Sequence, residues 1–499
     1  MDLLNHLFLA FNVALEPMNI LLCLLGCLVG TFVGVLPGLG PAAATSLLLP
    51  ITYKLPPVSA IIMLGGIYYG TQYGGSTTSI LINVPGEASS VVTCLDGYQM
   101  ARKGRAGAAL GIAAFGSFIA GTFGTFMLML VGPPLAGLAL KFGPPEFVGL
   151  VFLGLTLVTY LSSGSMAKAL MMATLGLLLS YVGIDLVTGR ERFTLGIPTI
   201  ATGFDIVPIV MGLFGVSEVL INIEGSSSRM SVFQTKIRGL LPTKKDWKDS
   251  SGALTRGTIL GFLIGIIPGA GGLTASFISY AVEKKVARHP ETFGTGDIRG
   301  VAGPESANNA AVQGAFIPML TMGIPCNVVI AILIGALMIH GVPPGPRLME
   351  DHPQLFWGVV GSMYIGNVML LLLNLPLISM WVKLLKVPYS LLFPFIFLFC
   401  LIGAYTVGNN IQDVYIMIVF GILGYLMKKY GYEPAPLVLA FVLGPMFENA
   451  FRQSFILSKG NPMIFLSHPI SAVFIVVSLF LLVFPLILNF LRSQHGQAN

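Results

Sequence analysis

The stretch GVLPGLGPAAATSLLLP, from Gly34 to Pro50, interrupts an apolar region with closely spaced glycines and prolines. A second stretch, GIIPGAGGLTASF, runs from Gly265 to Phe277 and repeats the same GxxPGxG spacing 231 positions later. Because Gly and Pro disfavour helix interiors, each stretch predicts a helix that stops and then restarts. Matched interruptions half a chain apart indicate an internal repeat of the kind found in secondary transporters.

The composition places both stretches in a membrane protein. Of the 499 residues, 55% are hydrophobic and 10% are charged, whereas soluble domains carry about 25% charged residues. Runs such as 111–132 and 472–491 are long enough to cross a hydrocarbon layer of about 30 Å as helices. The sequence therefore predicts an all-α polytopic membrane protein; a β-barrel would show only weak alternation of apolar and polar residues.

The hydrophobic segments fall into two membrane repeats, each with additional helices, joined by one long polar stretch. The first repeat covers 1–221, the stretch 222–253 is predicted to be a cytoplasmic linker, and the second repeat covers 254–499. In each repeat the GxxPGxG break precedes a long segment with a polar middle and a proline. Aligning Pro85 with Pro325 changes the offset between the repeats from 231 to 240, so the second copy carries about nine extra residues.

These two long segments are themselves predicted to be interrupted transmembrane helices. They read YGTQYGGSTTSILINVPGEASS and GPESANNAAVQGAFIPMLTMGIPCN, and the first interruption is expected at Tyr69–Ser79 and the second within 306–340. Each GxxPGxG break is predicted to be the tip of a re-entrant hairpin, which enters and leaves the membrane on one side. If both breaks were plain spanning helices instead, the sidedness of the chain would change.

The distribution of basic residues orients this arrangement. With residues 1–17 outside, 20 of the 27 Lys and Arg residues fall inside and 7 fall outside, as the positive-inside rule favours. Arg190 and Arg192 are the main exceptions. The same count predicts inverted repeats, because the two hairpins then enter from opposite faces.

Irregular backbone at membrane depth must be buried in protein or line a cavity, since its unpaired polar groups cost several kcal/mol each in lipid. Half-helix N-termini at such breaks direct N–H groups and positive dipole ends at anions. The breaks and their neutral polar neighbours therefore predict a substrate-binding set: Gly38, Gly40, Gly74, Gly75, Ser76, Thr77, Thr78, Gly269, Gly271, Asn308 and Asn309. The alternative is that these residues only kink and pack helices, with hydroxyls bonded to their own helix.

Freed carbonyls at the breaks are also suited to a coupling ion, Na⁺ or H⁺. Glu305 and Gln313 are the predicted ion-coupling residues, because charges at membrane depth are rare and usually functional. The alternative for Glu305 is a water-facing position at the cytoplasmic end of its segment. Four other acidic residues near segments lack matched partners and are expected to be structural or interfacial: Asp185, Asp205, Glu218 and Asp413.

Several function classes lack their signatures in the sequence. There is no HExxH helix, no GxSxG elbow and no Walker A lysine, so neither an enzyme nor an ATP-driven pump is indicated. The histidines show no metal spacing, and the five cysteines form no CxxC pair and are expected to pack as small residues. The sequence has no basic stripe with interleaved aromatic residues, so a nucleic-acid partner is not indicated.

The blocks GVLPGLGPAAATSLLLPITY, YGGSTTSILINVPGEASSVVTCLDGYQMARKGRAGAAL, GIIPGAGGLTASFISYAVEKK and FGTGDIRGVAGPESANNAAVQGAFIPMLTMGIP resemble the large membrane subunit of the bacterial tripartite tricarboxylate transporters. The resemblance covers most of the chain. It implies an ion-gradient-driven carrier of the inner (plasma) membrane for a di- or tricarboxylate or a related organic acid. It also implies two partners, a small membrane subunit of about four helices and a periplasmic substrate-binding protein, and a relation to carriers with an elevator-like transport domain.

Two classes of function remain at this point. One is a carrier that occludes its substrate, and the other is a channel-like or scaffold subunit. A channel should show a continuous polar stripe along several helices, whereas the polar residues here are confined to the predicted breaks. The carrier is therefore the favoured interpretation.

The predicted orientation is open to a direct measurement. We expect residues 95–106 to be labelled from the cytoplasmic face and residues 340–352 from the outer face, when single cysteines are placed there in a Cys-depleted variant. The reason is the 20-to-7 distribution of Lys and Arg. Labelling of both regions from the same side would contradict the inverted arrangement.

Overall fold

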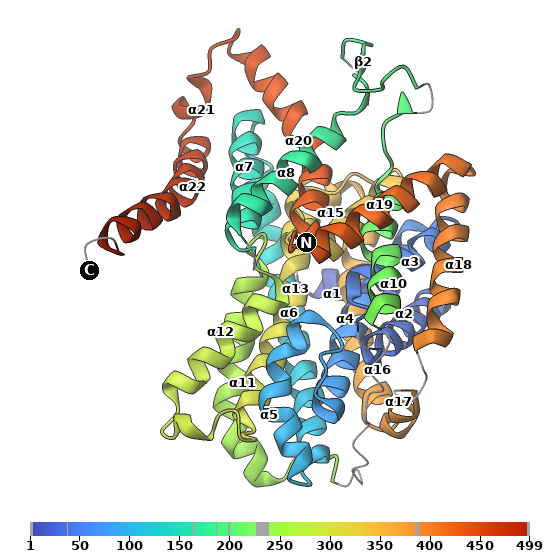
Figure 1. The fold of residues 1–499 in the computed structure, drawn as a ribbon, viewed down its shortest axis with the longest axis vertical. Helices are drawn as coiled ribbons and strands as arrows, with labels where there is room; N and C mark the ends of the chain where they lie inside the picture. The colour runs from blue at the N-terminus through green and yellow to red at the C-terminus, as the bar shows by residue number, and fades with distance from the viewer. Residues whose placement is uncertain are drawn as a thin grey trace.

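The computed structural model describes residues 3–36, 38–162, 165–185, 187–197, 200–225, 239–384 and 389–496. Its elements are almost all helical, with one short antiparallel hairpin, β1 paired with β2 (Figure 1). The elements of the first half are α1 Leu3–Ala14, α2 Pro17–Val35, α3 Pro41–Thr52, α4 Pro57–Ile82, η1 Ala88–Ser90, α5 Val91–Arg102, α6 Ala106–Ala139, α7 Pro144–Tyr160, α8 Met166–Ser180, β1 Gly183–Ile184, β2 Glu191–Arg192, α9 Ile206–Val210, the π-helical η3 Met211–Val216 and α10 Ser217–Gly225. Those of the second half are α11 Lys244–Gly265, α12 Gly271–Val286, η4 Pro290–Thr292, α13 Arg299–Met322, α14 Val328–Ile339, α15 Leu348–Asp351, α16 Pro353–Asn374, α17 Ile378–Leu384, α18 Tyr389–Gly408, α19 Ile411–Lys429, α20 Pro434–Leu457, α21 Ile464–Ser467 and α22 Pro469–Gly496.

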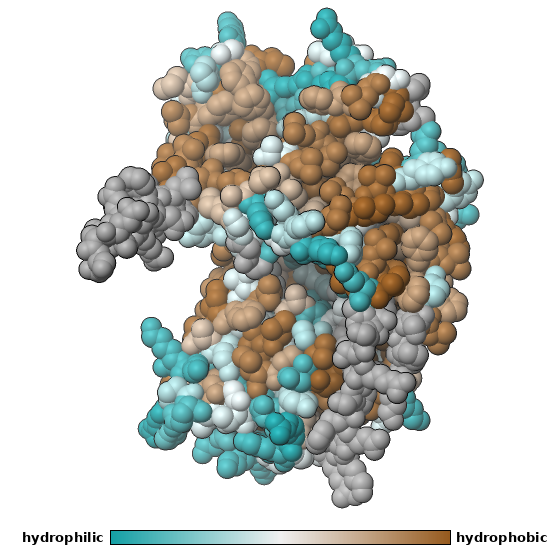
Figure 2. Space-filling model, in the orientation of Figure 1, coloured by the Kyte–Doolittle hydropathy of each residue, from teal (hydrophilic) through white to brown (hydrophobic). Residues whose placement is uncertain are grey.

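The helices build a surface suited to a lipid bilayer. Within the described residues, six helical stretches are long and apolar enough to cross a membrane: Pro17–Val35, Ala106–Ala139, Ile206–Glu224, Pro353–Asn374, Ile411–Lys429 and Pro434–Leu457. Figure 2 shows broad hydrophobic areas between hydrophilic residues at the two ends of the long axis. The predicted all-α polytopic membrane fold is therefore confirmed.

Four breaks interrupt the helices of the two repeats. The first, 36–40, separates α2 from α3, and the second, 83–87, follows α4. The third, 266–270, separates α11 from α12, and the fourth, 323–327, separates α13 from α14. The two GxxPGxG breaks and the interruption within 306–340 thus occur where the sequence predicts them, except that Pro37 lies outside the described residues.

The predicted interruption at Tyr69–Ser79 is wrong. These residues belong to the continuous helix α4, and the chain leaves the helix only at Asn83, which adopts a left-handed conformation with φ of 59°. Likewise, Glu305 and the amides after it lie inside the continuous helix α13. Within these two polar stretches the helix continues, although Pro304 and Pro318 of α13 lack the N–H that would complete the helical pattern.

A glycine ladder joins the first two long helices of each repeat, with the same spacing in both. The glycines of α2 lie against backbone carbonyls of α4, and those of α11 lie against carbonyls of α13, so closely that a β-carbon would collide with the oxygen. The pairs are Gly26 with Met63, Gly30 with Ile67 and Gly34 with Thr71 in the first repeat, and Gly257 with Gly303, Gly261 with Ala307 and Gly265 with Ala311 in the second. Every glycine pair is related by the offset 231 and every carbonyl pair by 240, so the packing reproduces both offsets read from the sequence. Small residues at such spacing let membrane helices approach closely.

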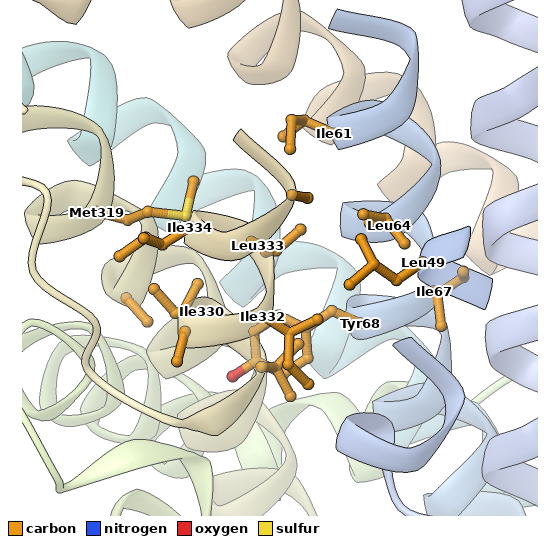
Figure 3. Close-up of a cluster of buried hydrophobic side chains, with 14 of the residues drawn as sticks. Leu49, Ile61, Leu64, Ile67, Tyr68, Met319, Ile330, Ile332, Leu333 and Ile334 are labelled. Atoms are coloured by element: carbon orange, nitrogen blue, oxygen red, sulfur yellow. The ribbon is translucent and has the colours of Figure 1, made fainter. Parts of the chain in front are cut away.

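The hydrophobic core lies between α3 and α4 of the first repeat and α13 and α14 of the second. Figure 3 shows Leu64 and Ile67 of α4 near Leu333 and Ile332 of α14, and all four side chains are buried. α14 contacts both α3 and α4. The two repeats are therefore joined through their interrupted helices.

The predicted linker 222–253 includes helical residues at both ends. α10 continues to Gly225, and α11 begins at Lys244, where Thr243 caps the helix through the N–H of Asp246. Residues 226–238 of the predicted linker 222–253 lie outside the described residues.

The C-terminal hydrophobic run forms α22, which packs on α7 and extends away from the rest of the chain (Figure 1).

The glycine ladder generates a stability prediction. Gly261→Ala should lower the unfolding temperature of the detergent-solubilised protein, because a methyl group there meets the Ala307 backbone and overpacking typically costs about 1–3 kcal/mol. The matched control is Gly137→Ala, since nothing lies within 4 Å of a β-carbon at Gly137. Equal unfolding temperatures for the two variants would show that the ladder does not determine the helix spacing.

Candidate functional site: a cavity at four helix breaks

All four helix breaks meet at one cavity of about 820 Å³. Its lining includes Gly38 and Gly40 of the first break, Glu87 of the second, Gly269 of the third and Asn327 of the fourth. The ends of α7, α10, α19 and α20 complete the wall. Segments from both halves of the sequence therefore enclose the same space.

Helix N-termini surround this cavity. α3 begins at Pro41 and α12 at Gly271, and neither N-terminus has a side-chain cap. Since the first N–H groups of a helix have no acceptor within the helix, the N–H groups of Ala42 and Ala43 and of Gly272 and Leu273 are available to a ligand. Together with the helix dipoles, each worth about half a positive charge, they add positive potential to a cavity whose lining also includes Glu87, Glu218 and Glu433.

The second and fourth breaks each place a polar N-cap residue at the cavity. Glu87 caps η1 by accepting from the N–H of Ser89 at 2.9 Å, and Asn327 caps α14 by accepting from the N–H of Ile330 at 3.0 Å. The 240-residue offset relates Glu87 to Asn327, so the two are equivalent positions of the repeat. Neither residue was among the predicted site residues, although the aligned sequences VPGE and IPCN place each of them two positions after a matched proline.

Two side chains of α4 complete the polar wall. Tyr68 accepts a hydrogen bond from Asn327 Nδ2 at 2.9 Å, and Gln72 accepts through Oε1 from Ser89 Oγ at 2.7 Å. Ser89 Oγ also contacts the Glu87 carboxyl. These contacts tie α4 to both break segments, so the shape of the cavity depends on them.

One ion pair lines the cavity. Lys428 of α19 pairs with Glu218 of α10, and Glu433 at the start of α20 accepts from Ser162 Oγ at 2.8 Å. No Arg belongs to the described lining. An anion in this cavity would therefore depend on N–H groups and neutral donors together with Lys428.

The predicted glycines of the two GxxPGxG breaks all line the cavity. Gly38 and Gly269 have φ values of 89° and 83°, which side-chain-bearing residues rarely adopt. The N–H of Gly269 also donates to the carbonyl of Cys326 at 2.8 Å, so the third break is tied to the fourth. Gly40 and Gly271 have no neighbour within 4 Å of an added β-carbon.

The predicted glycines and hydroxyls of α4 do not line this cavity. Gly74 lies against the Thr31 carbonyl and Gly75 against the Glu87 side chain. Thr78 Oγ1 donates to the Val35 carbonyl at 2.8 Å. Ser76 and Thr77 border a separate, very narrow cavity. Their predicted role in substrate binding stays a prediction.

The predicted amides of α13 are buried behind the cavity wall. Asn309 Nδ2 donates to Ser117 Oγ at 2.7 Å and to Asn308 Oδ1 at 2.8 Å. Asn308 lies one layer behind the start of α12. Its Cβ is 3.7 Å from the place that a β-carbon on Gly272 would occupy. Asn308 Nδ2 and Gln313 Oε1 have no hydrogen-bond partner among the described residues.

A second cavity, of about 510 Å³, lies beside the β-hairpin and is lined by paired charges. Arg192 makes two hydrogen bonds to Glu448, at 2.6 and 3.3 Å, and Arg452 pairs with Asp185 at 2.9 Å. The Thr188 hydroxyl, the Val187 N–H and Arg452 hold the pKa of Asp185 well below its usual range. Arg192, an exception to the positive-inside count, is therefore neutralised by a carboxylate.

Neither a metal site nor a disulfide is present among the described residues. Within the described ranges, no set of three His, Cys, Asp or Glu side chains could hold a metal ion. The described cysteines are all free, and four of the five are buried, as expected for packing residues.

The comparisons with known proteins agree with this geometry. Residues 20–439 match the family described as "Tripartite tricarboxylate transporter TctA family". The chain is 52% identical to an Agrobacterium vitis protein named "Uncharacterized 52.8 kDa protein in TAR-I ttuC' 3'region". The alignment spans 497 residues, which are 100% of this chain and 99% of that protein.

A second Agrobacterium vitis protein, named "Uncharacterized protein in TAR-II ttuC' 3'region", is 49% identical over 237 residues, 48% of this chain and 98% of that protein. No solved structure shows a significant match. The family match covers most of the chain and agrees with its apolar helices. The chain thus belongs to the TctA family of tripartite tricarboxylate transporters, as a multi-pass membrane transport subunit and not an enzyme.

Proposed function

We propose that this subunit is an ion-gradient-driven secondary carrier that takes up a carboxylate across the bacterial inner membrane and binds it in the cavity at the four helix breaks. The observation that carries the proposal is the convergence of all four breaks on one space. Irregular backbone at membrane depth occurs only where it is buried in protein or lines a cavity. Four independent kinks would have no reason to meet.

The cavity suits a small organic anion. Its volume of about 820 Å³ lies within the range of small-molecule sites. The uncapped N-termini of α3 and α12 supply N–H groups and positive dipole ends, and Asn327, Tyr68 and Gln72 supply neutral donors at the wall. A di- or tricarboxylate can accept hydrogen bonds from several of these groups at once.

The mechanism we propose uses the two repeats as opposed halves. The α2–α3 and α11–α12 pairs are re-entrant hairpins, related as inverted repeats, that move with the substrate in an elevator-like transport domain. The support is the Lys and Arg distribution together with the duplicated glycine ladder, which gives both hairpins the same packing.

The family is tripartite, and we propose that this chain works with a small membrane subunit of about four helices and a periplasmic substrate-binding protein. The coupling ion is Na⁺ or H⁺, with Glu305 and Gln313 as the coupling residues.

A counterflow assay with the assembled transporter tests the carrier assignment, because only a carrier exchanges labelled for unlabelled citrate. Passive flux without exchange would indicate a channel.

Asn327→Asp should raise the half-saturating citrate concentration about ten- to hundred-fold. Aspartate can still cap α14, but it replaces the Nδ2 donor with a charge beside an anionic substrate, and a contact to a charged group is worth about 1.5–3 kcal/mol. Initial uptake rates at fixed pH and Na⁺ measure this. Thr77→Ala and Asn308→Ala are the comparison, because both residues lie off the cavity. If the half-saturating citrate concentration rises more in Thr77→Ala and Asn308→Ala than in Asn327→Asp, the substrate site lies among the helices and not in the cavity.

Gly38→Ala should strongly reduce uptake while the protein stays in the membrane, since its φ of 89° strains any side-chain-bearing residue by about 1–3 kcal/mol. Gly40→Ala is the matched variant two positions on, with a φ of −69° and open space around its β-carbon position. We expect Gly40→Ala to retain uptake. Equal activity of the two variants, measured at equal expression, would mean that the turn at Gly38 is not needed.

A further inference from the structure

Glu305 is a fully buried carboxyl group without an ionic partner. It lies on α13, which packs against α4 and α5. Its Oε2 accepts from Ser76 Oγ at 2.5 Å, and its Oε1 accepts from Thr93 Oγ1. Among the described residues, no Lys, Arg or His forms an ion pair with it. A buried charge without a partner costs several kcal/mol, so the neutral, protonated form is favoured in this place.

The hydrogen-bond network around Glu305 can hold one proton more or less without moving the backbone. Ser76 Oγ lies 2.5 Å from Glu305 Oε2 and 3.0 Å from the carbonyl oxygen of Gln72, but a hydroxyl donates only one hydrogen. With Glu305 ionised, Ser76 donates to the carboxylate. With Glu305 protonated, Oε2–H donates to Ser76 Oγ, and the hydroxyl turns to the Gln72 carbonyl. Thr93 donates to Oε1 in both states.

The titratable neighbours of Glu305 add no positive charge. Tyr73 of α4, Cys94 of α5 and Glu87 of the second break interact with it electrostatically. All three are neutral or negative, so each disfavours the ionised form of Glu305 or leaves it unchanged.

α6, α11 and α12 also pack on α13. α12 brings Glu283, which pairs with Arg256 of α11 and lies beside Gly303, and the two charges of that pair cancel. α6 presents Ser117, which is neutral and accepts from Asn309. These groups give Glu305 no compensating positive charge, and only the Ser76 and Thr93 hydroxyls, which donate to its carboxyl group, support the ionised form.

The Glu305 network reaches the cavity through a single residue. Gln72 accepts from Ser76 through its backbone carbonyl and from Ser89 through its side chain, and both Gln72 and Ser89 line the cavity with Glu87. A carboxylate in the cavity adds negative charge one layer from Glu305 and so strengthens proton binding there. By linkage, a proton on Glu305 strengthens carboxylate binding by the same factor.

We propose that Glu305 is the proton-binding site of this transporter and that one proton moves together with each carboxylate. The coupling rests on the function proposed above, whereas the protonation of Glu305 does not. No covalent bond of the substrate changes. The proton is taken up by Glu305 on the loading side and released on the other side after the carboxylate leaves.

The transport test uses the assembled transporter in proteoliposomes, with radiolabelled citrate and the membrane potential clamped at zero. A one-to-one proton symporter accumulates substrate about tenfold per unit of pH gradient. Glu305→Gln should abolish this accumulation and retain counterflow, because glutamine mimics the protonated carboxyl toward Ser76 and Thr93. Glu146→Gln is the matched control, a buried carboxyl that caps α7 away from the cavity, and it should accumulate like the wild type.

Three results would overturn the proposal. The first is pH-driven accumulation by Glu305→Gln at the wild-type level. The second is uncoupling by Glu87→Gln while Glu305→Gln stays coupled, which would move the proton to the cavity wall. The third is accumulation by the wild type that follows an imposed Na⁺ gradient and ignores the pH gradient.

A spectroscopic measurement on the full chain alone separates the proton site from the proposed function. Infrared difference spectra recorded across a pH titration should show the carbonyl band of a protonated carboxyl in the wild type and in Glu146→Gln. The band should disappear in Glu305→Gln and shift in Glu305→Asp, which serves if the glutamine variant does not fold. An unchanged band in Glu305→Gln or in Glu305→Asp would overturn the proton site, whether or not citrate is transported.

Discussion

A helix that ends inside a hydrocarbon layer must find partners for its free N–H and C=O groups, and the arrangement of this protein depends on how its four breaks meet that requirement. At the two GxxPGxG breaks, the Val35 carbonyl accepts from the Thr78 hydroxyl at 2.8 Å and the Ile266 carbonyl accepts from the Cys326 thiol. The N-termini of α3 and α12 lie at the cavity without a side-chain cap, whereas Glu87 and Asn327 cap η1 and α14. The breaks before α3 and α12 therefore place free backbone N–H groups at the cavity independently of any charged side chain.

The glycine ladders are what bring the breaks to the same place. Without β-carbons, α2 lies on the carbonyl row of α4 and α11 on that of α13, which fixes how far each helix has slid along its neighbour. The break after each ladder then falls at a defined distance from Tyr68 and Gln72 in one repeat and from Asn308 in the other. Close backbone packing replaces the hydrophobic driving force that is missing between helices in lipid.

The hairpin breaks could be predicted from the sequence because Gly and Pro act locally: Gly38 and Gly269 need left-handed backbone wherever the chain packs. The interruption predicted at Tyr69–Ser79 was wrong because clustered Ser and Thr residues do not open a helix; Ser76 and Thr71 return hydrogen bonds to carbonyls of their own helix. Which polar residues face the cavity depends on the helix rotation set by tertiary packing, and the sequence pattern does not contain that rotation. Glu87 and Asn327, the N-cap residues two positions after the matched prolines, could have been predicted as cavity residues from the repeat alignment.

The two repeats share backbone geometry but differ in side-chain chemistry. Glu87 and Asn327 occupy equivalent N-cap positions, yet one is a carboxyl and the other an amide. Glu305 corresponds to Gly65 under the 240 offset, so the buried carboxyl has no counterpart in the first repeat. Geometry has to be duplicated, because each half meets the same demand for paired backbone groups. Side-chain chemistry is free to differ, and a second buried carboxyl would add a desolvation cost without helping to pair backbone groups.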